Sequence, residues 1–233
     1  MHLRKPSPWK LSVRWRVLFA TLFYRENSPS YSDIVQNIFE SDKVRKSEFV
    51  NSKKLDDRFD VLSLSVNETN HLDGIIAEFG VYNGETLRHI AKHANQDREI
   101  YGFDSFEGLP EKWGALLPKG HFKTSVPKFE NNRIKLQVGW FDETLPRFLE
   151  SENRLFSLIH IDCDLYGPTK FVLESLRPRL QKGTIIVFDE YYGYPSWQDH
   201  EHKAWQEFSR DSQIAYEAVA FSSHSACFRI TKS

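Results

Sequence analysis

Short apolar segments alternate with helix-like segments from residue 74 onward, and this alternation constrains the fold more than any other feature of the chain. The segments that read as strands span residues 74–80, 99–104, 133–138, 156–162 and 184–188. Helix-like segments span residues 84–93, 141–150, 168–180 and 197–209. Strands that are joined through helices pair in parallel, and the helices cover both faces of the sheet. The sequence therefore predicts an α/β fold around a mostly parallel sheet.

Both ends of the chain depart from this alternation. Residues 214–221 and 226–231 read as two strands with no helix between them, which predicts an antiparallel hairpin at one edge of the sheet. Residues 1–70 are polar and helix-like, with apolar helical spacing over residues 9–22 and 34–39; Ser32 or Asp33 would cap the second helix. We therefore expect an N-terminal helical extension over residues 1–70 and an α/β domain over residues 71–233.

The charge balance argues against one class of function. The chain has 31 lysines and arginines against 32 acidic residues, a net charge of -1. A protein that coats nucleic acid neutralises phosphates with a basic excess, so no nucleic-acid partner is expected. No apolar run approaches the roughly 18 residues of a membrane-spanning helix, so no integral membrane contact is expected. The two cysteines, Cys163 and Cys227, lack metal-ligand spacing and indicate a reduced, cytoplasmic protein.

Basic residues gather at the N-terminus. Residues 1–25 have no acid and contain these lysines and arginines: Arg4, Lys5, Lys10, Arg14, Arg16 and Arg25. Such a segment can lie on an anionic membrane surface, cover an anionic acceptor, or pack as a helix in a dimer. The third possibility is favoured, so we expect a homo-oligomer.

Acidic residues stand at or just after the ends of four predicted strands. In chain order they are Glu78, Asp104, Asp162, Asp164, Asp189 and Glu190. Ligands of an open parallel sheet bind at the carboxyl ends of its strands. Buried carboxylates are costly unless they are paired, hydrogen-bonded or bound to a metal. This edge of the sheet is therefore the predicted functional site.

Two glycines mark the turn after the first strand. Gly80 and Gly84 allow a ligand to approach the backbone, but Tyr82 stands where a dinucleotide-binding turn has its second glycine. A pyrophosphate would have little room there, whereas an uncharged or cationic nucleoside would fit, and Glu78 favours a cation. Asp104 ends the second strand, where a carboxylate can accept both hydroxyls of a ribose. A simple strand-to-helix turn with a loop acid is the alternative.

The acids of the later strands form a second candidate site. Asp162, Asp189 and Glu190 end neighbouring strands in the expected topology. Carboxylate oxygens, completed by water and substrate oxygens, suit Mg²⁺. The alternative is that these acids cap helices or pair with lysine and arginine.

Four segments together resemble class I S-adenosylmethionine-dependent methyltransferases, and among them the macrocin O-methyltransferase-like family. They are residues 78–84 (EFGVYNG), 101–110 (YGFDSFEGLP), 161–166 (IDCDLY) and 188–191 (FDEY). The resemblance covers roughly residues 70–231. It implies a Rossmann-like sheet of seven strands with an antiparallel last strand. It also implies that S-adenosylmethionine is the cofactor.

The resemblance assigns roles to individual residues. The turn with Glu78, Gly80, Tyr82 and Gly84 would hold the methionine part of the cofactor. The remaining cofactor residues would be Asp104 at the ribose with Ser105 and Phe106 beside it, Gly139 and Trp140 at the adenine, and Asp162. Mg²⁺ would be bound through Asp162, Asp189 and the next residue, which is Glu190 here where relatives commonly have Asp or Asn.

The implied reaction is methyl transfer to a hydroxyl of a small glycosidic or polyhydroxylated acceptor. A metal ion lowers the pKa of a bound hydroxyl and positions it, and a general base takes the proton. His200 and His202 are the first candidates for the base, and Asp189 and Tyr166 are the next ones. Two alternatives remain open: an NAD-dependent oxidoreductase on a similar sheet, and a non-catalytic binding module that retains the fold.

Two further segments are candidates for covering the site. The long loop over residues 106–131 reads as a lid that orders on cofactor binding. Tyr191, Tyr192, Tyr194 and Trp197 follow the fifth strand. They would form either a wall for the acceptor or a part of the core.

Overall fold

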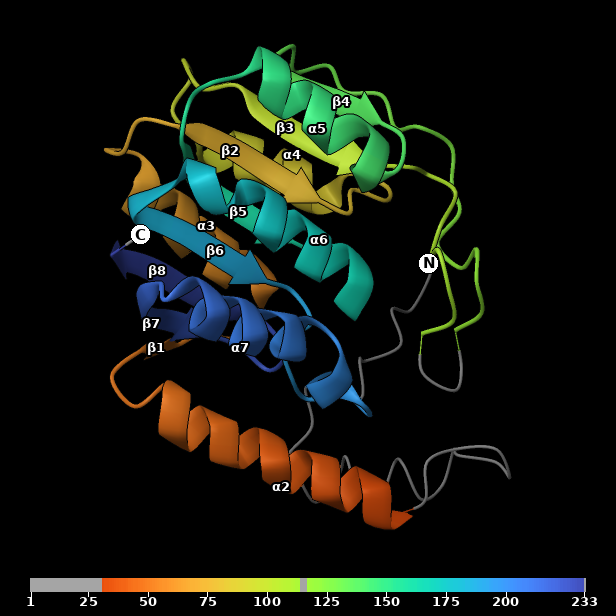
Figure 1. The fold of residues 1–233 in the computed structure, drawn as a ribbon, viewed down its shortest axis with the longest axis vertical. Helices are drawn as coiled ribbons and strands as arrows, with labels where there is room; N and C mark the ends of the chain where they lie inside the picture. The colour runs from red at the N-terminus through yellow and green to blue at the C-terminus, as the bar shows by residue number, and fades with distance from the viewer. Residues whose placement is uncertain (1–30, 114–116, 233) are drawn as a thin grey trace, which may run out of the picture.

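One mixed sheet organises the chain (Figure 1). The computed structural model describes residues 31–113 and 117–232. The sheet has eight strands: β1 (Lys53–Lys54), β2 (Ile75–Phe79), β3 (Ile100–Asp104), β4 (Ile134–Val138), β5 (Phe156–Ile161), β6 (Leu180–Phe188), β7 (Ala215–Phe221) and β8 (Ala226–Lys232). The described α-helices are α2 (Tyr31–Glu48), α3 (Arg58–Thr69), α4 (Glu85–His93), α5 (Phe141–Ser151), α6 (Tyr166–Leu176) and α7 (Glu201–Ser212).

The strand order is β1-β7-β8-β6-β5-β2-β3-β4. β8 lies between β6 and β7 and is antiparallel to both, whereas the other neighbouring strands pair in parallel. The mostly parallel sheet with an antiparallel last strand is therefore confirmed. β1 is an eighth strand that the sequence analysis did not include, because two lysines carry no strand pattern.

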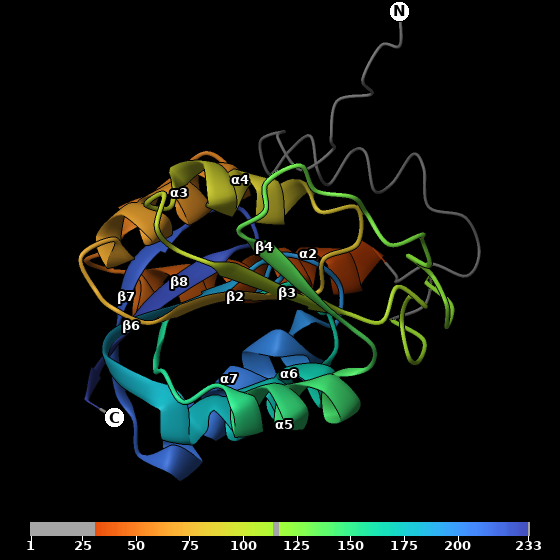
Figure 2. The ribbon, with the colours of Figure 1, turned by 90° about the horizontal axis from the view of Figure 1, so that it is seen from above.

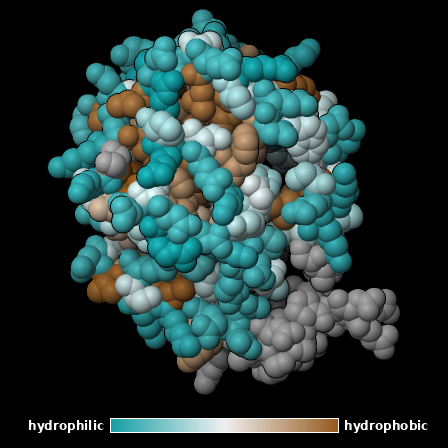
Figure 3. Space-filling view, in the orientation of Figure 1, coloured by the Kyte–Doolittle hydropathy of each residue, from teal (hydrophilic) through white to brown (hydrophobic). Residues whose placement is uncertain are grey.

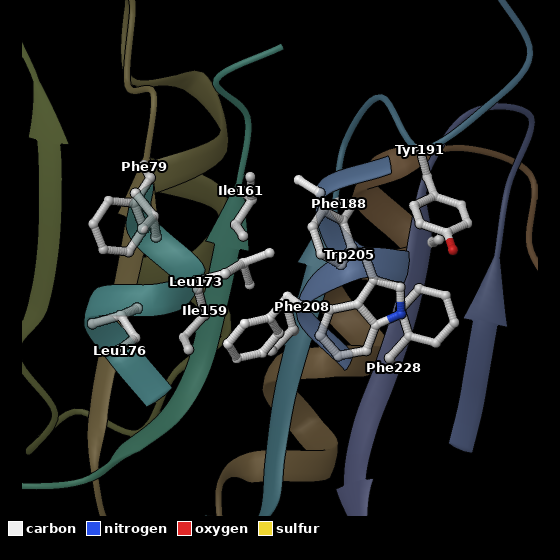
Figure 4. Packing of buried hydrophobic residues seen from close by; sticks show 14 of the residues in the cluster. Phe79, Ile159, Ile161, Leu173, Leu176, Phe188, Tyr191, Trp205, Phe208 and Phe228 are labelled. Atoms are coloured by element: carbon white, nitrogen blue, oxygen red, sulfur yellow. The ribbon is translucent and has the colours of Figure 1, made fainter. Parts of the chain in front are cut away.

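Helices cover both faces of the sheet, as expected. Figure 2 shows α3 and α4 on one face and α5, α6 and α7 on the other. The core on the α5–α7 face is rich in aromatic side chains, and Trp205 stacks on Phe228 with ring centroids 5.2 Å apart (Figure 4). Hydrophilic residues cover most of the face in Figure 3, where hydrophobic residues appear in small groups. The apolar content of the chain is thus concentrated between the layers.

The described part of residues 1–70 contributes to the core on the opposite face of the sheet. Asp57 caps α3 by accepting hydrogen bonds from the backbone N–H groups of Phe59 and Asp60. α3 then buries Val61 and Leu62 against the sheet. α2 is longer than the helix expected around residues 34–39, and it lies beyond the β1 end of the sheet in Figure 1. The helix expected over residues 9–22 and the basic segment 1–25 lie outside the described residues.

Two helix boundaries differ from the sequence expectation. The helix expected over residues 168–180 begins earlier, at Tyr166, and ends at Leu176, because Leu180 already pairs with Phe156 as the first residue of β6. The helix expected from residue 197 begins as a short 3-10 turn, and α7 follows from Glu201. Among the described residues, no helix is both long and apolar enough to cross a membrane.

Candidate active site

The carboxyl ends of the central strands meet at the point where the strand order reverses. From β2 the chain moves outward to β3 and β4, then returns to β5 on the other side of β2. Backbone hydrogen bonds join the segments that leave the strands. The N–H of Asp162 donates to the carbonyl oxygen of Phe79, and the N–H of Asp189 donates to the carbonyl oxygen of Ile161. This crevice is where ligands of open α/β sheets bind.

A cavity of about 370 Å³ opens at this edge. Eight of the predicted site residues line it: Gly80, Tyr82, Asp104, Ser105, Trp140, Asp162, Asp189 and Glu190. The expected nucleoside residues and the expected cation ligands therefore share one cavity. Leu109, Pro110, Trp113 and Phe122 from the 106–131 loop also line it, so this loop forms part of the wall.

The glycine turn has a shape that few other residues could adopt. Gly80 has a φ of 95°, and a Cβ atom there would lie 1.8 Å from the carbonyl oxygen of Asp162. Gly84 has a φ of 76°, and a Cβ there would lie 2.5 Å from Cζ of Phe129. Both positions therefore require glycine, because of φ and because of close packing.

Asp104 holds the glycine turn in place. Its Oδ2 accepts hydrogen bonds from the backbone N–H groups of Val81 and Tyr82, each at 2.8 Å, and its Oδ1 accepts one from Phe106 at 2.7 Å. Tyr82 and Phe106 both have positive φ values, 49° and 59°, so these hydrogen bonds stabilise an otherwise unfavourable backbone. Phe106 is buried and does not line the cavity.

The acids after β5 and β6 form a dense cluster. Burial and the nearby Asp189 carboxylate raise the pKa of Asp162 well above its usual range. The same two causes raise the pKa of Asp164 from 3.8 to about 8, and that of Glu190 well above its usual range. Carboxylates that favour protonation in this way are stabilised in the ionised form when a cation lies beside them.

Glu201 connects two of the segments that carry these acids, and the sequence analysis missed it. Its side chain is fully buried, its Oε1 accepts a hydrogen bond from the N–H of Asp164, and its Oε2 accepts one from the N–H of Glu190, each at 3.2 Å. The available signal was its position one turn before Trp205 on the buried face of α7.

His160 and Glu78 form a buried pair beneath the cavity. The His160 Nδ1 lies 2.9 Å from Glu78 Oε2, and its Nε2 lies 3.7 Å from Asp189 Oδ1. Burial by itself disfavours the imidazolium, but the flanking Asp189 and Glu78 outweigh it and raise the pKa of His160 to about 10. Burial raises the pKa of Glu78 as well, so the pair shares a proton between the imidazole and the carboxyl. Glu78 was expected to contact the cofactor, yet it lies outside the cavity wall.

Arg58, the first residue of α3, is the second cation of the cluster. Its Nη1 lies 2.9 Å from Asp189 Oδ2. Burial raises the pKa of the Asp189 carboxyl, but His160 and Arg58 outweigh that effect and lower it below the usual value. No sequence motif pointed to Arg58, because it comes from the segment taken as an extension.

The two predicted histidine bases lie elsewhere. His200 packs near Trp113 and Tyr194, and His202 packs against Tyr191 and Trp197 with its Nε2 3.6 Å from Glu48 Oε1. Neither histidine lines the cavity, and neither do Gly84 and Gly139. The N–H of Gly139 donates to the backbone oxygen of Asp104, so Gly139 supports the site from the backbone.

The aromatic residues after β6 are part of the core. Tyr191 and Tyr192 are fully buried, Trp197 nearly so, and Tyr194 is 9% exposed. None of the four lines the cavity. Of the two interpretations left open, core packing is therefore the one that the structure supports. The cavity contact on this side comes from Trp113, whose ring packs edge-on to Tyr194.

The acid cluster has the donor chemistry of a divalent-cation site. Ligand atoms of His160, Asp162 and Asp189 all lie within 4.8 Å of one another. Asp189 Oδ1 is buried and accepts no hydrogen bond, and its nearest ionic partner is His160 Nε2 at 3.7 Å, so this oxygen is free to bind a cation. Glu190 is not part of this group, although it lines the same cavity. Hard oxygen ligands suit Mg²⁺, which favours the carboxylates over the imidazole. The residues present therefore fit the metal.

The raised pKa of Asp164 predicts a pH-dependent stability in the absence of divalent cations. The folded protein holds the Asp164 proton up to about pH 8, whereas the unfolded chain releases it near 3.8, so stability falls as pH rises through this window. Asparagine tolerates the φ of 65° at this position. Asp164→Asn should therefore reduce the loss of unfolding free energy between low and high pH by about 1–3 kcal/mol.

Urea unfolding at several pH values, with EDTA present, measures the effect. The exposed Asp97→Asn is the matched control, and it should leave the pH dependence unchanged. Equal pH profiles for the wild type and Asp164→Asn would show that Asp164 is not buried as a raised-pKa acid.

Comparisons with known proteins agree with this geometry. Residues 77–191 match the model of a family described as a methyltransferase domain. A sugar O-methyltransferase of Streptomyces olivaceus, 8-demethyl-8-(2,3-dimethoxy-alpha-L-rhamnosyl)-tetracenomycin-C 4'-O-methyltransferase, is 29% identical over 160 residues, which is 58% of this chain and 60% of the relative. The resemblance to S-adenosylmethionine-dependent O-methyltransferases is thus confirmed.

Solved methyltransferase structures share the fold. The calicheamicin methyltransferase CalS11 superimposes with a TM-score of 0.62 at 24% identity, covering 88% of this chain and 95% of that chain. An O-methyltransferase from Bacillus cereus, solved in complex with SAH, has a TM-score of 0.54 at 12% identity and covers 92% of this chain and 96% of that chain. The chain spans between 55% and 63% of the length of three curated relatives.

Proposed function

We propose that this protein is an S-adenosylmethionine-dependent O-methyltransferase that acts on a hydroxyl of a small, sugar-like acceptor. One observation carries the proposal: the glycine turn clamped by Asp104 and the acid cluster around Asp189 line the same cavity. A cofactor held by the first would face a hydroxyl held by the second. The match to methyltransferase domains and the sugar substrate named for the Streptomyces olivaceus relative support this assignment.

The cofactor would bind along the ends of β2 and β3. Gly80, Asp104 and Trp140 line the cavity there. Trp140 would offer an aromatic face to the adenine, and Asp104 would accept from the ribose. A carboxylate has about four acceptor positions, and three on Asp104 are taken by backbone N–H groups. Asp104 can therefore accept a hydrogen bond from one ribose hydroxyl directly. To accept from both hydroxyls, it would have to lose one of its three hydrogen bonds from backbone N–H groups.

Asp162, Asp189 and Glu190 would hold a divalent cation. When bound, such an ion polarises an acceptor hydroxyl and lowers its pKa. His160 would stay behind Asp189, with its Nε2 3.7 Å from Asp189 Oδ1, and Glu201 would fix the backbone of Glu190. The chain thus supplies the orientation that methyl transfer from an activated sulfonium mainly needs.

The acceptor proton needs a base within the cavity. His200 and His202 do not line it, and two of the cavity carboxylates are assigned to neither the ribose nor the cation: Asp164 and Glu85. Glu85 lies at the solvent edge of the cavity, 3.9 Å from Arg58. Asp164 keeps its proton up to about pH 8 in the absence of a cation, and a divalent cation bound nearby would favour its ionised form. In that form Asp164 would be the carboxylate best placed to take the acceptor proton. Its backbone is fixed by the hydrogen bond from its N–H to Glu201.

Calorimetric titration with S-adenosylmethionine and with NAD tests the cofactor assignment. Binding of S-adenosylmethionine with no response to NAD is expected. NAD binding without S-adenosylmethionine binding would replace the proposal with an oxidoreductase. A panel of nucleotide-linked and antibiotic-linked sugars, assayed for transfer of a labelled methyl group, then identifies the acceptor.

Removing divalent cations should lower methyl transfer at least about 100-fold, because the hydroxyl loses both its activation and its position. The measurement is turnover of an acceptor found in the panel after EDTA treatment, with and without added Mg²⁺. Recovery with Mg²⁺ is expected in the wild type and not in Asp189→Asn. Full activity in EDTA would show that the carboxylates act without a metal ion.

A further inference from the structure

Arg58 occupies a position that neither the cofactor nor the acceptor hydroxyl explains. Its Nη1 lies 2.9 Å from Asp189 Oδ2, and its Nη2 lies 3.9 Å from Oε2 of Glu85, the first residue of α4. Among the lysines and arginines of the described chain, Arg58 alone lines the cavity. The guanidinium thus forms an ion pair with Asp189, which is one of the carboxylates that would bind the divalent cation in the proposed function.

The surroundings show why a cation is needed at this point. Asp162, Asp164 and Glu190 line the same cavity as Asp189, so several carboxylates meet in a partly desolvated space. The Asp189 side chain is only 4% exposed, and leaving a buried carboxylate without a counter-charge is strongly destabilising. In the protein without metal, Arg58 supplies that charge, with its Nη1 2.9 Å from Asp189 Oδ2.

The two partners of Arg58 differ in a way that allows it to move. The Glu85 side chain is 60% exposed, and that of Arg58 is 38% exposed, so their contact lies at the solvent edge of the cavity. A divalent cation on Asp189 would repel the guanidinium from its present place. Glu85 is then the nearest carboxylate that can receive it.

We propose that Arg58 is a built-in competitor of the divalent cation: it neutralises Asp189 in the metal-free protein and moves to Glu85 when the ion binds. The inference rests on the cation site of the proposed function. Its consequence is that the carboxylate cluster always has a counter-charge, and that the affinity for the cation is held below what the oxygens alone would give.

Mn²⁺ binding to the full chain, measured by electron paramagnetic resonance of the free ion, tests the competition without any turnover assay. We expect the Arg58 guanidinium to leave the cation site free in about a tenth of the wild-type molecules. Arg58→Met removes the guanidinium and frees the site in all molecules, so it should bind Mn²⁺ at least about tenfold more tightly than the wild type. Arg58→Gln provides a second variant with the same expectation, should the methionine variant fold poorly. Arg229→Met is the matched control, since Arg229 pairs with Glu68 and Glu217 away from the cavity, and it should not change the affinity.

A double-mutant cycle tests the role of Glu85. Glu85→Gln should weaken Mn²⁺ binding in the wild-type background, because the guanidinium loses its alternative partner. In the Arg58→Met background the same change should have little effect, because there is no guanidinium to receive. Equal effects in both backgrounds would show that Glu85 acts on the ion directly and would overturn the movement of Arg58.

The remaining outcomes separate the competition from the cation site itself. Equal or weaker Mn²⁺ binding in both Arg58 variants would overturn the competition and leave the cation site in place. Absence of Mn²⁺ binding in the wild type and in both Arg58 variants would remove the metal ion from the proposed function, and the competition with it.

Discussion

Gly80→Ala is expected to abolish binding of S-adenosylmethionine and to lower the free energy of unfolding by about 3 kcal/mol or more. A Cβ at this position would lie 1.8 Å from the carbonyl oxygen of Asp162, so the ends of β2 and β5 would have to separate. The φ of 95° adds strain that an alanine cannot relieve locally. Because the turn and the acid cluster share this contact, both halves of the cavity would be displaced.

Urea unfolding and calorimetric titration measure the two effects. Gly167→Ala is the matched control: no atom lies within 4 Å of the Cβ it would add, and the position lies inside α6. It should be neutral or slightly stabilising, because alanine favours helix over glycine. Normal cofactor affinity in Gly80→Ala would show that the cofactor does not use this turn.

Asp104→Ala is expected to weaken S-adenosylmethionine binding about 100-fold or more. Each backbone N–H that loses a charged acceptor costs about 1–3 kcal/mol, and three such groups depend on this carboxylate. The positive φ values of Tyr82 and Phe106 would then lack their support, so the turn would reach the binding shape in fewer molecules.

The same titration checks this expectation, and Glu152→Ala is its control. Glu152 also accepts a backbone hydrogen bond, from the N–H of Arg154, but it does not line the cavity. Its removal should leave the cofactor affinity unchanged. An Asp104→Ala protein that is folded and binds the cofactor as tightly as the wild type would place the ribose elsewhere.

The arrangement of the sheet could be predicted because each of its elements has a local signature. The alternation of apolar strands with helices predicted that the strands pair in parallel. The two final strands, which have no helix between them, predicted the antiparallel β8. The sequence also predicted which residues meet at the functional edge, because parallel strands place their carboxyl ends at one edge of the sheet. These strand-end residues include Gly80, Asp104, Asp162 and Asp189.

Residues that act through long-range contacts could not be found in this way. Arg58 reaches Asp189 across 131 residues, and its segment has no strand or motif to mark it. His160 lies within the segment 156–162 that was expected as a strand, but its pairing with Glu78 depends on β2 and β5 being neighbours. The histidines His200 and His202 looked suitable by type and spacing, yet α7 directs them into aromatic packing.

Chain order and residue type therefore defined the fold class, the functional edge and the carboxylates that stand on it, since hydrophobic period and turn chemistry are local properties. The tertiary structure alone decided which charges meet there. Asp189 lies between His160 and Arg58, and Glu201 accepts hydrogen bonds from the backbones of both Asp164 and Glu190. The physical reason is that the cost of a buried charge depends on its nearest partners in space, and those partners come from segments that only folding brings together.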